Sequence, residues 1–122
     1  MKVKANHRTH PAFLLVLIPL LLLSCSKPVP PGKQEYVGEW KSKEMYMLIL
    51  ADGSLRYQRL KGGGTVEVSG PIKEFQGDNI VVGIGFITTT FEVSTPPHEE
   101  EGVWKMVVDG VELVRSKRET KA

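Results

Sequence analysis

Few side chains in this sequence have the chemistry of a catalytic or metal site, and one segment holds most of them. Residues 95–102 set His98 beside Glu99, Glu100 and Glu101. One imidazole nitrogen with several carboxylate oxygens suits Mn²⁺ or Zn²⁺, so one interpretation is a weak metal site or a partner-docking loop. The other is a solvated acidic loop stiffened by proline, because consecutive loop residues rarely converge on one ion. If the carboxylates do surround His98, its pKa should rise.

The remaining residues do not form the common enzyme motifs. His98 is the only histidine beyond residue 24, and no serine stands in a G-x-S-x-G motif. The glycine-rich runs 62–64 and 83–85 lack the following Lys-Ser/Thr pair and helix start of a phosphate-binding loop. We therefore expect no catalytic residue, no resident metal and no cofactor.

Cys25 is the only cysteine and directly follows an apolar stretch close to the N-terminus. Lys2, Lys4 and Arg8 give the chain a positive start, and residues 12–23 form an apolar run of twelve residues interrupted by one proline. A positive start followed by a short apolar run is typical of a secretory signal. The run is too short to span a bilayer, which needs about 20 apolar residues.

The four residues that end at this cysteine resemble a known motif. Leu22-Leu23-Ser24-Cys25 is similar to the lipobox of bacterial lipoproteins, which has an aliphatic residue, a tolerant position, a small residue and cysteine. The resemblance implies cleavage between Ser24 and Cys25, diacylglycerol on the Cys25 sulfur and usually an acylated amino group. Several acyl chains anchor a protein stably, whereas a single chain binds marginally. The alternatives are an ordinary signal peptide with a cysteine at its cleavage site, or an uncleaved anchor.

The residue after the cysteine bears on where such a lipoprotein would reside. Position 26 is serine, not the aspartate that tends to retain lipoproteins of the enteric type at the inner membrane. The resemblance therefore implies an outer-membrane lipoprotein that faces the periplasm, if the organism has two membranes. In an organism with one membrane it implies the outer face of the cell membrane.

Loss of residues 1–24 would change the charge balance and leave one small domain. Three of the 16 Lys and Arg residues lie in that segment, which leaves 13 basic residues against 14 acidic ones. A nucleic-acid partner would need a clustered basic face, so we expect none. With Cys25 lipidated, the remaining 98 residues have no thiol for a disulfide and must rely on packing in a modest core.

The mature chain divides into three parts by composition. Residues 25–37 hold the cysteine and a proline-rich stretch, residues 38–116 form the expected β domain, and residues 117–122 form a charged tail. Proline favours polyproline II, so residues 26–34 are predicted to be an extended tether. At about 3.1 Å per residue, that tether would hold the domain roughly 25–30 Å from the lipid surface.

Two Asp-Gly pairs between alternating apolar runs predict hairpins with two-residue turns. At Asp52-Gly53 this register sets Leu50 opposite Leu55. One face then holds Tyr46, Leu48, Leu50, Leu55 and Tyr57, and the other holds Met47, Ile49, Arg56 and Gln58. At Asp109-Gly110, Val108 opposes Val111 and Met106 opposes Leu113. There the apolar face holds Trp104, Met106, Val108, Val111 and Leu113.

Four further strand-like segments lie between the hairpins, at residues 65–69, 72–75, 79–84 and 88–94. Glycine separates most of them, which is typical of a small all-β domain. We therefore predict an all-β fold: a small antiparallel meander of about eight short strands that closes into a barrel or a flattened sandwich.

A second resemblance concerns the start of the domain. Gly38-Glu39-Trp40 is similar to the G-x-W opening of lipocalins and related β-barrel binding proteins. In that family the tryptophan closes one barrel end and packs against a late arginine, a position that Arg115 matches in kind. The resemblance implies a cation–π pair of Trp40 and Arg115, worth about 0.5–2 kcal/mol. The mature chain is much shorter than a lipocalin, which leaves little room for a ligand cup.

Three functions remain open on these residues. The first is a non-enzymatic envelope lipoprotein, held in the membrane by Cys25, whose β domain binds another envelope component through an exposed edge or a loop face. The second is a lipocalin-like carrier or sensor of a small apolar ligand. The third is a weak metal site or an enzyme centred on His98. Apolar residues near Met45 and around Gly85, including Ile84 and Phe86, are interpreted as either core or a hydrophobic groove.

Overall fold

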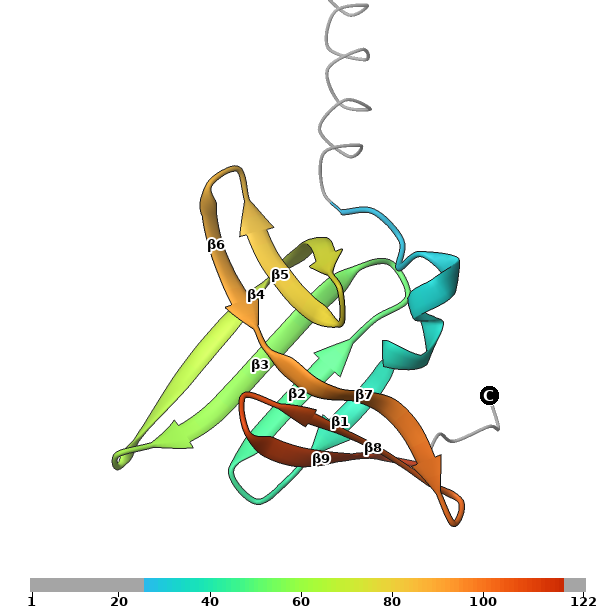
Figure 1. Ribbon diagram of the computed structural model, residues 1–122. Coiled ribbons are helices and arrows are strands. Elements are labelled where there is room, and N and C mark those ends of the chain that lie inside the picture. The colour runs from blue at the N-terminus through green and yellow to red at the C-terminus, as the bar shows by residue number, and fades with distance from the viewer. Residues whose placement is uncertain (1–25, 118–122) are drawn as a thin grey trace, which may run out of the picture.

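The computed structural model describes residues 26–117, which form nine strands and one short 3₁₀ helix (Figure 1). In chain order the elements are η1 (Pro31–Tyr36), β1 (Gly38–Lys41), β2 (Met45–Ile49), β3 (Ser54–Lys61), β4 (Gly64–Gln76), β5 (Asn79–Ile84), β6 (Ile87–Phe91), β7 (Val93–Glu100), β8 (Val103–Val108) and β9 (Val111–Arg115).

All strands belong to one antiparallel sheet with the order β6-β5-β4-β3-β2-β1-β9-β8-β7. The sheet curls into a half-barrel (Figure 1). The predicted antiparallel all-β fold is therefore confirmed, whereas the strand count is nine and the sheet does not close. Its two edge strands, β6 and β7, are consecutive in the chain with only Glu92 between them. They therefore continue along the chain instead of folding back on each other as a hairpin.

Differences in strand count have local causes. The predicted strands 65–69 and 72–75 are parts of one strand, β4, which pairs with β3 up to Pro71 and with β5 from Ile72 onward. Gly70-Pro71 thus marks a transfer between partners and not a turn. Strand β1 was not predicted, and it joins the two hairpin systems by pairing with both β2 and β9. The predicted strand 88–94 is divided at Glu92 between β6 and β7.

The core lies on the concave side of this sheet and consists of large apolar side chains. Seven of them have no exposed surface: Trp40, Met47, Ile49, Ile80, Met106, Val108 and Leu113. Phe91 is 2% exposed, and its ring centroid lies 4.6 Å from that of Tyr57. The described residues bury no charged or polar side chain. Burial at about 25 cal/mol per Å² makes this cluster the main stabilising feature of the domain.

The predicted register of the first hairpin is wrong by one residue. Ile49 pairs with Leu55, and Met47 with Tyr57, so the connection is the three-residue loop 51–53. Gly53 takes a left-handed φ of +90° there, as three-residue loops require. The slip turns Met45, Met47 and Ile49 inward and leaves Leu50 45% exposed. A shift of one residue exchanges the two faces of a strand.

The register of the second hairpin is confirmed. Val108 pairs with Val111 and Met106 with Leu113 across the two-residue turn Asp109-Gly110. Both turn residues have positive φ, at 48° and 82°. Such a turn matches the twist of the flanking strands, which is why the Asp-Gly pair predicts it well.

The N-terminal segment packs onto the domain, so the prediction of an extended, free tether over residues 26–34 is wrong. Val29 is 4% exposed, and its N–H donates to the carbonyl of Ala51 at 3.0 Å. From Pro31 the chain is helical, which brings Tyr36 into the core and its hydroxyl to the carbonyl of Asp78. A Cβ on Gly53 would lie 1.8 Å from the Lys27 carbonyl oxygen, so only glycine allows this close approach.

Candidate functional site

The segment around His98, predicted to be a loop, is part of strand β7. His98 pairs with Lys105 and Glu100 with Val103 on β8, and only Glu101-Gly102 forms the turn. Prolines within a strand usually argue against it, but β7 is an edge strand, where proline is tolerated. The register shift between Thr95 and His98 takes up the two prolines.

The strand geometry separates the three carboxylates instead of gathering them around the imidazole. His98 Nε2 lies 3.1 Å from Glu100 Oε2, and the Lys105 ammonium lies 3.1 Å from Glu100 Oε1. Glu99 points to the other face because side chains alternate along a strand. Glu101 occupies the turn with a φ of 51°. Within residues 26–117, no group of three or more His, Cys, Asp or Glu residues is arranged to hold a metal ion.

The result is a small, exposed network of ion pairs between β7 and β8, in which Glu100 contacts both His98 and Lys105. The pKa of His98 is raised from 6.5, first by the hydrogen bond to the Pro96 carbonyl and then by the bond to Glu100. The pKa of Glu100 is lowered by its hydrogen bonds to Lys105 and His98. Protonation of His98 therefore adds a positive charge at the end of this edge.

Arg115 and two tryptophans form a stack at one end of the half-barrel. The Arg115 guanidinium carbon lies 5.5 Å from the ring centroid of Trp40 and 4.8 Å from that of Trp104. The same guanidinium donates to the carbonyls of Glu35 and Val37. Trp40 and Arg115 thus come together as expected, while the sequence had placed Trp104 simply on a core face. The alternation of β8 and β9 sets Trp104 and Arg115 side by side.

A groove of about 1040 Å³ runs beside this stack on the outer face of the sheet. Leu48 and Leu50, which the predicted register had turned inward, lie along it with Val103 and Val114. Three of these aliphatic residues are more than a third exposed. Gln34, Glu39, Ser116 and Lys117 also line the groove, so it offers both apolar and polar contacts.

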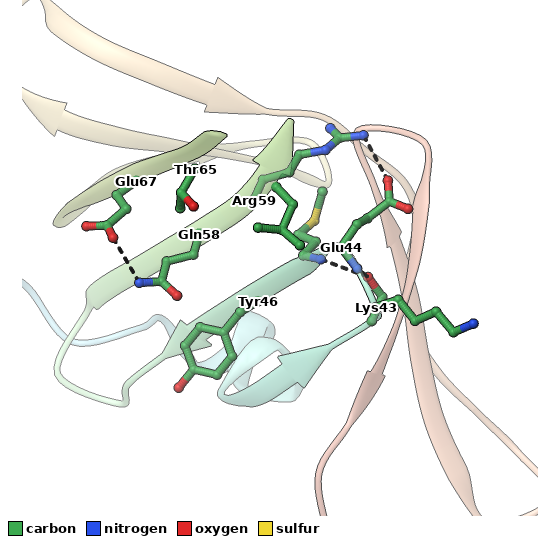
Figure 2. Close-up of a pocket in the computed structure, with 10 residues that line it drawn as sticks. Lys43, Glu44, Tyr46, Gln58, Arg59, Thr65 and Glu67 are labelled. Carbon is green, nitrogen blue, oxygen red and sulfur yellow. Dashed lines mark hydrogen bonds and ion pairs between the residues drawn. The ribbon is translucent and has the colours of Figure 1, made fainter. Parts of the chain in front are cut away.

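A shallower groove of about 340 Å³ lies over β2, β3 and β4 (Figure 2). Its polar side chains mostly bind one another: Arg59 contacts Glu44 at 3.3 Å, and Gln58 donates to Glu67 at 3.1 Å. Lys43 extends away from the groove in Figure 2. Paired groups spread over an open surface are poor recognition elements for a small molecule, which is usually held in a concave site.

The β5–β6 hairpin carries a different kind of surface. Ile84, Phe86 and Ile87 are 72%, 94% and 75% exposed, the three highest values among large apolar side chains in the described range. Beyond them, residues 88–90 are three exposed threonines on the free edge of the sheet. Ile84 and Phe86, interpreted from the sequence as either core or a groove, are not in the core, whereas Phe91 at the end of β6 is.

Ser24 and Cys25, the predicted cleavage and lipid-attachment residues, lie outside the described residues. In the part of the chain that is described, no helix has the length and apolarity to cross a bilayer. No protein-family model matches this sequence, and neither a curated protein nor a solved structure matches it.

Proposed function

We propose that this chain is a lipid-anchored protein of the bacterial cell envelope whose β domain binds another envelope protein along strand β6. Cys25 carries the lipid, and in a two-membrane organism the domain faces the periplasm from the outer membrane. The lipobox-like Leu22-Leu23-Ser24-Cys25 supports the anchor. The binding role rests on one observation, the unprotected edge of β6.

Strand β6 is hydrogen-bonded to β5 alone and ends the sheet. Its residues 87–90 carry no charge and no proline, and all four are exposed. Soluble proteins usually block such an edge with charges, prolines or bulges, because its free N–H and C=O groups pair with any extended chain. Partner proteins use this property by adding a strand, and main-chain hydrogen bonds then provide the affinity. An extended segment of the partner is therefore the occupant that this edge fits.

The two alternatives draw less support from the geometry. A carrier of an apolar ligand needs interior space, but side chains such as Trp40, Met47 and Met106 fill the interior with no exposed surface. An enzyme or metal site centred on His98 needs converging ligands, but Glu100 is shared with Lys105 and Glu99 faces away.

The anchor is tested by intact mass and membrane fractionation of the wild type beside Cys25→Ser. We expect the wild type to lack residues 1–24, carry acyl mass and sediment with membranes, while the variant is released or mislocalised. A wild type without acyl mass would contradict the lipid anchor but would not bear on partner binding at β6.

The edge is tested by photo-cross-linking from an unnatural amino acid at Thr88 in living cells. We expect one discrete product, identified by mass spectrometry, that disappears when Thr89→Lys places a charge on the edge. Ser94→Lys makes the same charge change on β7 and should leave the product intact, since Ser94 is exposed on the other edge. A product insensitive to Thr89→Lys would contradict binding at β6.

A further inference from the structure

The turn between β5 and β6 carries apolar side chains that the core does not bury. Ile84 pairs with Ile87, so Gly85 and Phe86 form the two-residue turn, with Gly85 at a φ of +63°. The three apolar side chains at this tip are 72–94% exposed. A soluble domain gains nothing from a phenylalanine that points fully into water, and such patches usually mark a contact surface.

The position of the tip is set relative to the start of the described chain. Segment 26–30, blue in Figure 1, enters at the same end of the molecule as this turn. The Ser26 hydroxyl donates to the Asp52 carbonyl at 2.9 Å, so the chain is held to the domain up to the residue next to Cys25. An anchor at Cys25 therefore leaves the domain at this end, with almost no free linker.

Contacts along this end connect the two features. Lys27 and Lys73 both line an apolar pocket of about 410 Å³. The Lys73 ammonium in turn donates to the Gly85 carbonyl at the tip, at 2.6 Å. Lys73 thus connects this pocket beside the chain entry to the apolar turn. Glu74 lines the same pocket, so its charge is mixed and the apolar side chains carry the argument.

We propose that the β5–β6 turn inserts Ile84, Phe86 and Ile87 into the lipid surface beside the anchor. This rests on the lipid anchor of the proposed function and adds to it a fixed orientation of the domain. Apolar side chains leave water when they enter the acyl boundary, and a second attachment point prevents rotation about the first. Lys27 and Lys73 would then lie at the level of the anionic headgroups, which attract basic side chains.

The insertion is tested on the purified, acylated full-length product in vesicles of phosphatidylethanolamine and phosphatidylglycerol. Because Cys25 is the only cysteine and its sulfur carries lipid, Phe86→Cys introduces the single free thiol. An environment-sensitive fluorophore on that thiol reports contact with spin-labelled lipid through quenching. Lys61→Cys at the end of β3 is the matched control, because the β3–β4 turn lies away from the chain entry in Figure 1.

We expect blue-shifted emission and strong quenching at position 86, and neither effect at position 61. Adding Ile84→Ser to the labelled protein should reduce the quenching, because it removes one of the inserted side chains. Intact mass reports acylation separately. An acylated, vesicle-bound protein with equal quenching at both positions overturns the insertion alone. A protein without acyl mass overturns the anchor, and with it the orientation proposed here.

Discussion

The two edges of the sheet, β6 and β7, are built in opposite ways although one residue separates them in the chain. Strand β7 carries two prolines and ends in glutamates, with a register shift beside the prolines. These are the devices by which proteins protect an edge from pairing with other chains. Strand β6 has none of them, and three of its five residues are threonine. Thus β7 is protected against pairing with other chains, and β6 is not.

The edges also differ in how they are held. Strand β6 buries one side chain, Phe91 at its end, whereas β7 buries both Val93 and Pro97. At the junction the Glu92 N–H donates to the Asp109 carboxylate and the Val93 N–H donates to the Asn79 side chain, at 2.9 and 2.8 Å. Two hydrogen bonds therefore hold the junction between β6 and β7, and the exposed residues 87–90 of β6 precede it. Four experiments test this difference between the two edges.

The largest effect is expected from removal of the one buried side chain of β6. Phe91→Ala should lower the free energy of unfolding by about 3–5 kcal/mol, as large-to-small core substitutions do. The matched control Phe86→Ala removes the same group from the exposed tip and should change stability by under about 0.5 kcal/mol. Urea unfolding measures both. Equal losses would show that β6 is not held at one end only.

Removing the hydrogen bond between the Asn79 side chain and the Val93 N–H should lower the free energy of unfolding by a smaller amount. Asn79→Ala leaves the Val93 N–H without its side-chain acceptor in a partly buried position, and the expected loss is about 1–2 kcal/mol. Gln58→Ala removes an exposed hydrogen bond to Glu67 and serves as the control, with a loss under about 0.5 kcal/mol. Urea unfolding again measures the difference. An Asn79→Ala protein as stable as the wild type would mean that the junction does not depend on this bond.

Replacing Pro96 with a residue that has a backbone N–H should make β7 more prone to pair with another chain. Pro96 is exposed, and Pro96→Thr should raise the apparent mass above that of the wild type at high concentration in analytical ultracentrifugation. Pro96→Lys restores the same N–H but adds a charge, so it should sediment like the wild type. If Pro96→Thr also sediments like the wild type, proline is not what protects this edge.

The smallest expected effect is the pH response of the β7 edge. The folded pKa of His98 lies above 6.5, so its stabilising contribution is complete below that pH and is lost as pH rises through the folded pKa. Glu100→Gln should move the His98 pKa part of the way back, because the Pro96 carbonyl still accepts its hydrogen bond. NMR titration of the imidazole follows both proteins. An unchanged His98 pKa in the variant would exclude Glu100 as a cause.

The sequence predicted the β7 side-chain cluster only in part. Because His98 is adjacent to glutamates in the sequence, it was expected to lie near a carboxylate. The alternation of side chains along a strand then sets Glu100 on the same face as His98 and Glu99 on the opposite face. This alternation could not be predicted from the sequence, because the two prolines and three glutamates indicated a loop and not a strand. Proline became compatible with a strand only because the tertiary fold puts β7 at an edge.

The all-β class follows from the sequence alone, through short apolar segments separated by glycine, and so does the register at Asp109-Gly110, where Lys105 and Glu112 mark the outward face. The lipobox-like motif at Cys25 likewise depends on sequence alone. Tertiary structure decided the register of the first hairpin, because both faces of residues 45–50 are apolar and the pattern fits either. In the structure the N-terminal segment packs against this loop, with the Lys27 carbonyl beside Gly53 and the Val29 N–H donating to the Ala51 carbonyl. Such contacts join distant parts of the chain, and no local pattern records them.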